Sequence, residues 1–101
     1  MEIKITPEAH NDIANIYQFI KKDGEQIAKN QVNCIYKGLE NLQLFPEMGI
    51  SLQKFVERTT DLRCLIINKV YVIIYGVTDV VEILRVFRKD QDFISDLGIS
   101  D

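Results

Sequence analysis

The sequence predicts an α+β fold in which an antiparallel helical hairpin packs on an antiparallel β-meander, with a strand before the hairpin and a short helix after the meander. Two observations carry this prediction. Up to residue 45, apolar residues recur at steps of three and four, which is typical of amphipathic helices. Between residues 62 and 88, three runs rich in valine, isoleucine, leucine and tyrosine are separated by two-residue turns, which is typical of antiparallel strands.

A short strand and a helix open the chain. Residues 2–6 alternate apolar and polar side chains, as a strand does. Thr6 then offers a hydroxyl to cap a helix, and Pro7 suits the first helical position because no N–H donor is needed there. We predict a helix over residues 7–22. Its buried stripe is expected to contain Ala9, Ile13, Ile16, Tyr17 and Ile20, opposite a polar face of Glu8, Asn11, Asp12 and Asn15.

A second helix follows the pair Asp23-Gly24, which breaks the first. It is predicted over residues 25–45 and ends at Pro46, since the residue before a proline avoids the helical conformation. Two helices joined by so short a turn should pair antiparallel. The apolar stripe expected on this helix comprises Ala28, Val32, Ile35, Leu39, Leu42 and Phe45.

The rest of the chain is predicted to form the sheet. We expect a loop over residues 47–61, in which residues 52–56 form an edge strand, and then strands over residues 62–67, 70–77 and 80–88. The turn pairs are Asn68-Lys69 and Thr78-Asp79. These strands are so apolar that both sheet faces need cover. The hairpin can cover one face, the helix expected over residues 92–97 is too short for the other, and a partner protein could supply the remainder.

Composition limits the function. The 101 residues suit one domain over residues 1–101, and the net charge of −3 argues against nucleic-acid binding through bulk positive charge. The sequence has neither a transmembrane run nor a signal peptide, so a cytoplasmic protein without membrane contact is expected. Cys34 and Cys64 are expected to be reduced core residues. With one histidine and no nucleotide-binding or metal motif, we predict no cofactor and no metal site.

Basic residues on the meander are the most informative polar feature. Arg63 opens the first long strand, and Arg85, Arg88 and Lys89 lie at the end of the last. By alternation, Arg85 should share a face with Ile83 and Phe87. Two interpretations stay open. The arginines either extend to solvent at the sheet edges or pair with Asp90 and Asp92, or they form a basic patch for an anionic partner. Two further candidates are Tyr71 and Tyr75, which are expected on one face of a strand, either as packing residues or as a contact platform.

Taken together, the order and spacing of several segments resemble the ParE/RelE superfamily of bacterial type II toxins over essentially the full length. The segments are Ile5-Thr6-Pro7-Glu8-Ala9, Asp12-Ile13, Ile16-Tyr17-Gln18-Phe19-Ile20, residues 39–46, Leu62-Arg63, Tyr71-Val72-Ile73-Ile74-Tyr75 and Ile83-Leu84-Arg85-Val86-Phe87-Arg88. The resemblance implies a toxin of the plasmid-stabilisation type that inhibits growth and is neutralised by a cognate antitoxin, whose C-terminal segment covers the sheet. It also implies that operator DNA is contacted only through the antitoxin complex.

The superfamily contains two activities. RelE-like members cleave mRNA on the ribosome with basic side chains and without metal, whereas ParE-like members inhibit DNA gyrase. In the RelE pattern, Arg63 and Lys89 match basic positions. Leu65 and Val72, however, stand where a lysine and an arginine are expected, and Ser95 falls near the place of a terminal tyrosine. The negative net charge of the chain and the long helical hairpin also favour a ParE-like protein over a RelE-like one.

We therefore expect a ParE-like toxin without catalytic residues that binds a protein target, DNA gyrase. The residues expected to contact the target or the antitoxin are Arg63, Tyr71, Tyr75, Arg85, Arg88 and Lys89. One alternative is a metal-independent, ribosome-dependent endoribonuclease in which Arg63, Arg88 and Lys89 carry the chemistry, so whether the chain is an enzyme stays open. A second alternative is an inactive member that only binds its antitoxin.

Overall fold

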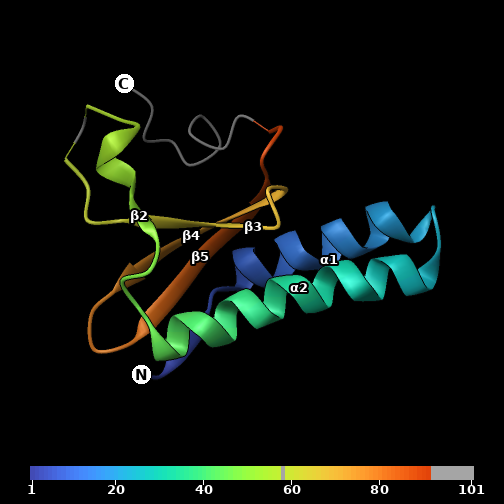
Figure 1. Cartoon of the computed structure of the whole chain (residues 1–101), viewed down its shortest axis with the longest axis horizontal. Helices are drawn as coiled ribbons and strands as arrows, with labels where there is room; N and C mark the ends of the chain where they lie inside the picture. Colours follow the sequence, from blue (N-terminus) through green and yellow to red (C-terminus); the bar gives the residue numbers. More distant parts are fainter. Residues whose placement is uncertain (58, 92–101) are drawn as a thin grey trace.

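Two helices pack on one face of a five-stranded mixed sheet (Figure 1). The computed structural model describes residues 1–57 and 59–91. The sheet order is β1-β5-β4-β3-β2. Along the chain the elements are β1 (Ile3–Ile5), α1 (Pro7–Lys21), α2 (Glu25–Leu44), β2 (Ile50–Ser51), the 3-10 helix η1 (Leu52–Lys54), β3 (Arg63–Ile67), β4 (Tyr71–Val77) and β5 (Val81–Arg88).

The helical hairpin forms as predicted, with each helix one residue shorter at its C-terminal end. The Thr6 hydroxyl accepts a hydrogen bond from the backbone N–H of Ala9 at 3.1 Å, which caps α1. Gly24 precedes α2 with φ of 144°, a conformation that residues with a Cβ rarely adopt. Phe45, which was expected on the buried stripe, is instead 63% exposed because α2 ends at Leu44.

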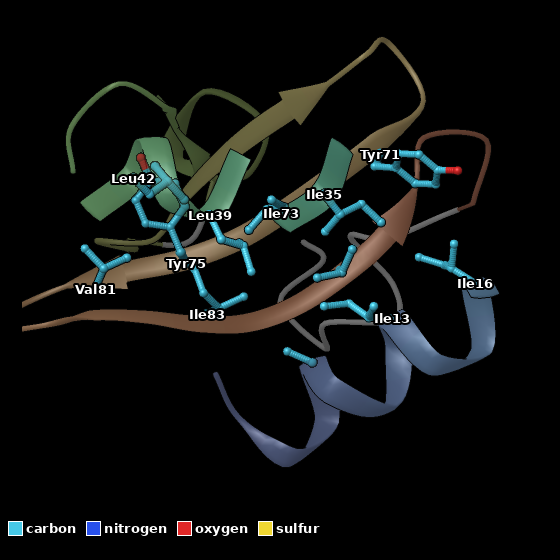
Figure 2. Packing of buried hydrophobic residues seen from close by; sticks show 12 residues of the cluster. Ile13, Ile16, Ile35, Leu39, Leu42, Tyr71, Ile73, Tyr75, Val81 and Ile83 are labelled. Atoms are coloured by element: carbon cyan, nitrogen blue, oxygen red, sulfur yellow. The ribbon is translucent and has the colours of Figure 1, made fainter. Parts of the chain in front are cut away.

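The main core lies between the helices and the sheet. Figure 2 shows side chains of both helices converging on β4 and β5. The two tyrosines of β4, Tyr71 and Tyr75, lie inside this cluster and are 2% and 0% exposed. Its other buried members are Ala9, Ile13, Ile16, Ile35, Leu39, Leu42, Ile73, Val81, Ile83 and Val86.

A second, smaller apolar cluster lies on the opposite face of the sheet. It comprises Leu52, Cys64, Val72, Ile74 and Phe87, all buried. The edge strand predicted over residues 52–56 is wrong, because η1 occupies residues 52–54 and places Leu52 against this cluster. The chain's own loop thus supplies part of the cover that was expected from a partner. The helix predicted over residues 92–97 lies outside the described residues.

The position of β1 makes the sheet mixed. Strands β3, β4 and β5 form the antiparallel meander, whereas β1 runs parallel to β5 and pairs only with residues 81–83. The pairing of β4 with β5 contains a register shift, because Tyr75 pairs with Ile83 while its neighbour Ile74 pairs with Arg85. The extra residue interrupts the alternation of β5. Ile83 therefore joins the main core while Phe87 joins the second cluster, and the prediction that Arg85 shares a face with both is wrong.

Beyond the residues that pair with β1, backbone groups at the edge of β5 bind side chains instead of a neighbouring strand. The Thr6 hydroxyl donates to the carbonyl of Leu84 at 2.9 Å. The Asp12 carboxylate accepts the N–H of Val86 at 2.9 Å and holds the Arg85 guanidinium through two bonds of 2.7 and 2.9 Å. Asp12 was expected on the solvent-exposed face of α1, yet its side chain is only 11% exposed. This carboxylate therefore stands in for a neighbouring strand and joins α1 to β5.

The loop before β2 is held close to the sheet at Gly49. Its N–H donates to the Tyr75 hydroxyl at 2.9 Å. A Cβ on Gly49 would stand 2.7 Å from the carbonyl oxygen of Cys64, which belongs to the backbone of β3. A side chain at this position would therefore push the loop away from the strand. In the described residues, no helix is long and apolar enough to cross a membrane.

We predict that Gly49→Ala lowers the free energy of unfolding by about 1–3 kcal/mol, because the backbone of β3 cannot yield to the added methyl group. Urea unfolding followed by circular dichroism measures the change. Gly76→Ala is the matched control: the nearest atom to its Cβ would be Leu62 Cδ2 at 3.5 Å, an ordinary contact. Equal stability of the two variants would contradict the close approach at Gly49.

We predict that Asp12→Ala lowers the free energy of unfolding by about 2 kcal/mol or more, since it removes the carboxylate that accepts from the Val86 N–H and from the half-buried Arg85 guanidinium. Asp12→Asn should cost less, because an amide oxygen still accepts one bond. Urea unfolding is again the measurement, with the exposed Glu40→Gln in α2 as the control, expected within about 0.5 kcal/mol of the parent. A urea midpoint of Asp12→Ala equal to that of the control would show that the carboxylate does not stabilise the edge of β5.

Candidate protein-binding surface

The candidate site residues fall at opposite ends of the sheet. Arg63 on β3 pairs with Tyr75, and Arg88 on β5 pairs with Tyr71, four residues away along β4. Four residues of strand span about 13 Å, so the two arginines are far apart along the sheet and lie on different strands. The sequence-predicted cations therefore do not form one cluster.

Arg63 holds the loop before β2. Its guanidinium donates to the carbonyl of Gly49 at 2.8 Å and approaches that of Glu47 at 3.5 Å. Both backbone polar groups of Gly49 are therefore bound: its N–H donates to the Tyr75 hydroxyl, and its carbonyl accepts from Arg63. The guanidinium is thus engaged in the fold, and its geometry is that of a positioning residue for the loop.

The two tyrosines are internal. Burial raises the pKa of Tyr71 and of Tyr75, although nearby Arg88 and Arg63 respectively act in the opposite direction. The Tyr71 hydroxyl donates to Gln31 Oε1 at 2.9 Å, and the Tyr75 hydroxyl accepts from Gly49. In this structure neither ring faces solvent, so neither offers a platform to a partner.

Arg85 is also engaged within the fold. Besides its two bonds to Asp12, its guanidinium lies 4.6 Å from the centre of the Phe87 ring. The Asp12 carboxylate balances its charge, and only 31% of its side chain is exposed. The predicted pairing of these arginines with acids at the end of β5 does not hold for Arg85, whose partner comes from α1.

Arg88 is half-buried, and Lys89 beside it is exposed. The Arg88 guanidinium lies 4.5 Å from the centre of the Phe19 ring, on α1. Asp90 lies 3.7 Å from Arg88 Nε, beyond hydrogen-bond distance, and its side chain is 77% exposed, so this pair is worth little. Lys89 is exposed, and within residues 1–57 and 59–91 its ammonium group has no ion pair.

Two hollows meet at Arg88. The first, of about 350 Å³, lies between α1 and β5, and the second, of about 390 Å³, lies beside the turn between β3 and β4. Arg88 lines both. The first is lined by Asp12, Asn15, Ile16, Phe19, Arg85, Val86, Arg88 and Gln91, and the second by Lys69, Val70, Arg88, Lys89 and Asp90.

Sequence reasoning missed the part that α1 plays in this surface. Asp12, Phe19 and Lys22 were not proposed as functional residues, and neither was Lys69 in the turn. A signal for Asp12 was present, because it lies three residues after Ala9 and four before Ile16, on the buried stripe. Phe19 was detectable as a large aromatic residue outside that stripe.

The arrangement offers cationic donors beside an exposed aromatic ring, which suits an anionic or mixed anionic and apolar partner. Among the described residues, no group of three or more histidine, cysteine or acidic side chains is placed to hold a metal ion. Both cysteines are free, with Cys64 buried and Cys34 half-buried.

Comparison with known proteins identifies the family. Among curated proteins no match is found. A solved structure described as the chromosomal ParDE toxin–antitoxin system from P. aeruginosa is similar, with a TM-score of 0.73 and 23% identity, over 87% of this chain and 95% of that one. That likeness shows the fold. The family model described as the ParE toxin of the type II toxin–antitoxin system parDE matches residues 3–93. The chain therefore belongs to the ParE toxin family.

Proposed function

We propose that this chain inhibits growth by binding DNA gyrase in the cytoplasm and that a cognate antitoxin neutralises it. Membership of the ParE family supports the toxin role. The observation that favours inhibition by binding over ribonuclease chemistry is the engagement of Arg63, whose guanidinium is bound to the carbonyl of Gly49. The proposal is therefore inhibition by binding, without a reacting side chain on this protein.

The ribonuclease alternative requires several basic side chains to converge on one phosphate. Here Arg63 and Arg88 are separated by about 13 Å along β4 and by the width of two strand spacings. Arg63 also holds its loop, which leaves Arg88 and Lys89 at the far end of the sheet. This arrangement favours a binding surface over a nucleolytic centre.

The antitoxin is proposed to cover the half-buried Arg88 and the exposed Lys89. The chain then reaches operator DNA only as part of the antitoxin complex, in keeping with its net charge of −3. The third possibility, a member that binds its antitoxin but no longer inhibits growth, would retain the same surface. These alternatives differ in what happens within minutes of producing the chain without its antitoxin.

Pulse labelling of bacteria after induction of this chain alone tests the proposal. Thymidine incorporation should fall before methionine incorporation, because a poisoned gyrase blocks replication before it depletes message. Purified protein should then inhibit supercoiling by DNA gyrase in vitro. An early fall in methionine incorporation would overturn the choice of gyrase, and unchanged incorporation of both labels would leave the antitoxin-binding function alone.

A pair of variants separates binding from ribonuclease chemistry. Lys89→Ala removes an exposed cation that the ribonuclease alternative needs, and Lys37→Ala removes an exposed cation on α2 that it does not. We expect no site-specific cuts in ribosome-bound message with the parent chain. Cuts that persist in Lys37→Ala and vanish in Lys89→Ala would establish the ribonuclease instead.

A further inference from the structure

We propose that the surface formed by Phe19, Lys22, Lys69, Arg88 and Lys89, here called the Phe19–Arg88 surface, binds an acidic segment of a partner protein. The inference rests on the proposed function only in that the chain acts by binding a protein. It adds the chemistry of the partner segment and brings in Phe19, Lys22 and Lys69. It does not depend on which protein contributes that segment.

Phe19 is the centre of this surface. Phe19 is 53% exposed, although contact between an apolar side chain and water is unfavourable. Arg88 lies 4.5 Å from the ring centre and Lys22 Nζ lies 5.8 Å from it, so cations from β5 and from the residue after α1 flank the ring. Stacking on the ring orders the Arg88 guanidinium and limits the side-chain entropy lost on binding.

The charges around the ring are available. Lys22, Lys69 and Lys89 are exposed, and within the described ranges none of them has a salt bridge. Lys69 is carried on the β3–β4 turn with φ of 60°, and this turn is tied to the end of β5 by the bond from Lys89 N–H to the Val70 carbonyl at 2.6 Å. Figure 1 shows that turn beside the end of β5. Lys69 and Lys89 thus line one hollow with Arg88.

An acidic protein segment fits this surface better than a nucleic acid does. The whole chain carries a net charge of −3, so a long polyanion meets repulsion from most of the molecule. A duplex also derives its affinity from many phosphate contacts, for which this surface is too small. A short segment with a few carboxylates and an apolar side chain can pair with the cations while contacting Phe19 and the hollow beside it.

Fluorescence anisotropy tests the proposal with a short labelled glutamate peptide that carries one central phenylalanine. We expect the double variant Lys69→Glu/Lys89→Glu to raise its dissociation constant at least about tenfold. Lys37→Glu/Lys54→Glu is the matched control, with two exposed lysines outside the surface, and should stay within about twofold of the parent. Phe19→Ala changes no charge and should still weaken binding by about threefold.

Three results would overturn the inference. The first is peptide affinity unchanged by Lys69→Glu/Lys89→Glu, and the second is an equal loss in the control, which would indicate general electrostatics. The third is tighter binding of a labelled oligothymidylate than of the peptide, which would indicate a nucleic-acid surface. Any of these three results, obtained while thymidine incorporation still falls on induction, would overturn the surface and leave the gyrase proposal intact. Peptide binding at this surface without an effect on DNA synthesis would support the surface and contradict the gyrase proposal.

Discussion

The contact between the Asp12 carboxylate and the edge of β5 determines how the two layers of this protein meet. Because β1 pairs only with residues 81–83, the backbone of β5 beyond that point would be an open edge. Asp12 occupies it by accepting the Val86 N–H and by holding Arg85. This fixes α1 along β5, and the face of α1 that carries Asp12 also carries Phe19 seven residues later. The bonds of Asp12 to β5 therefore also position Phe19 next to the end of β5.

A second constraint acts at the other end of β4. Tyr75 reaches from the main core to bind the Gly49 N–H, while Arg63 binds the Gly49 carbonyl, so one loop residue is held by two strands. The absence of a side chain at Gly49 permits the approach. This loop then places Leu52 on the second sheet face. Arg63 and Tyr75, which were predicted from the sequence as contact residues, therefore stabilise the fold through these bonds.

The elements were largely predictable from the sequence, since caps, turn residues and apolar periodicity are local. Pro7, Gly24 and the Asn68-Lys69 turn mark their elements within one residue. What escaped prediction depends on distant partners. The pairing of β1 with β5 and the salt bridge between Asp12 and Arg85 each join residues more than seventy positions apart in the sequence. The interrupted alternation at Leu84 depends on the register in which β4 pairs with β5. Exposure of Phe45 and replacement of the edge strand by η1 arise from loop geometry that periodicity does not encode.

The same separation explains why residue type alone could not select the site. Arg63, Arg85 and Arg88 are chemically identical, yet the fold binds the first to a loop carbonyl and the second to a carboxylate. Only Arg88 is stacked on an exposed ring with a loosely placed acid. A charged side chain becomes available to a partner when the fold has not already satisfied it, and that condition is set by tertiary pairing. The net negative chain can thus present one small cationic surface, which selects its partner by arrangement rather than by total charge.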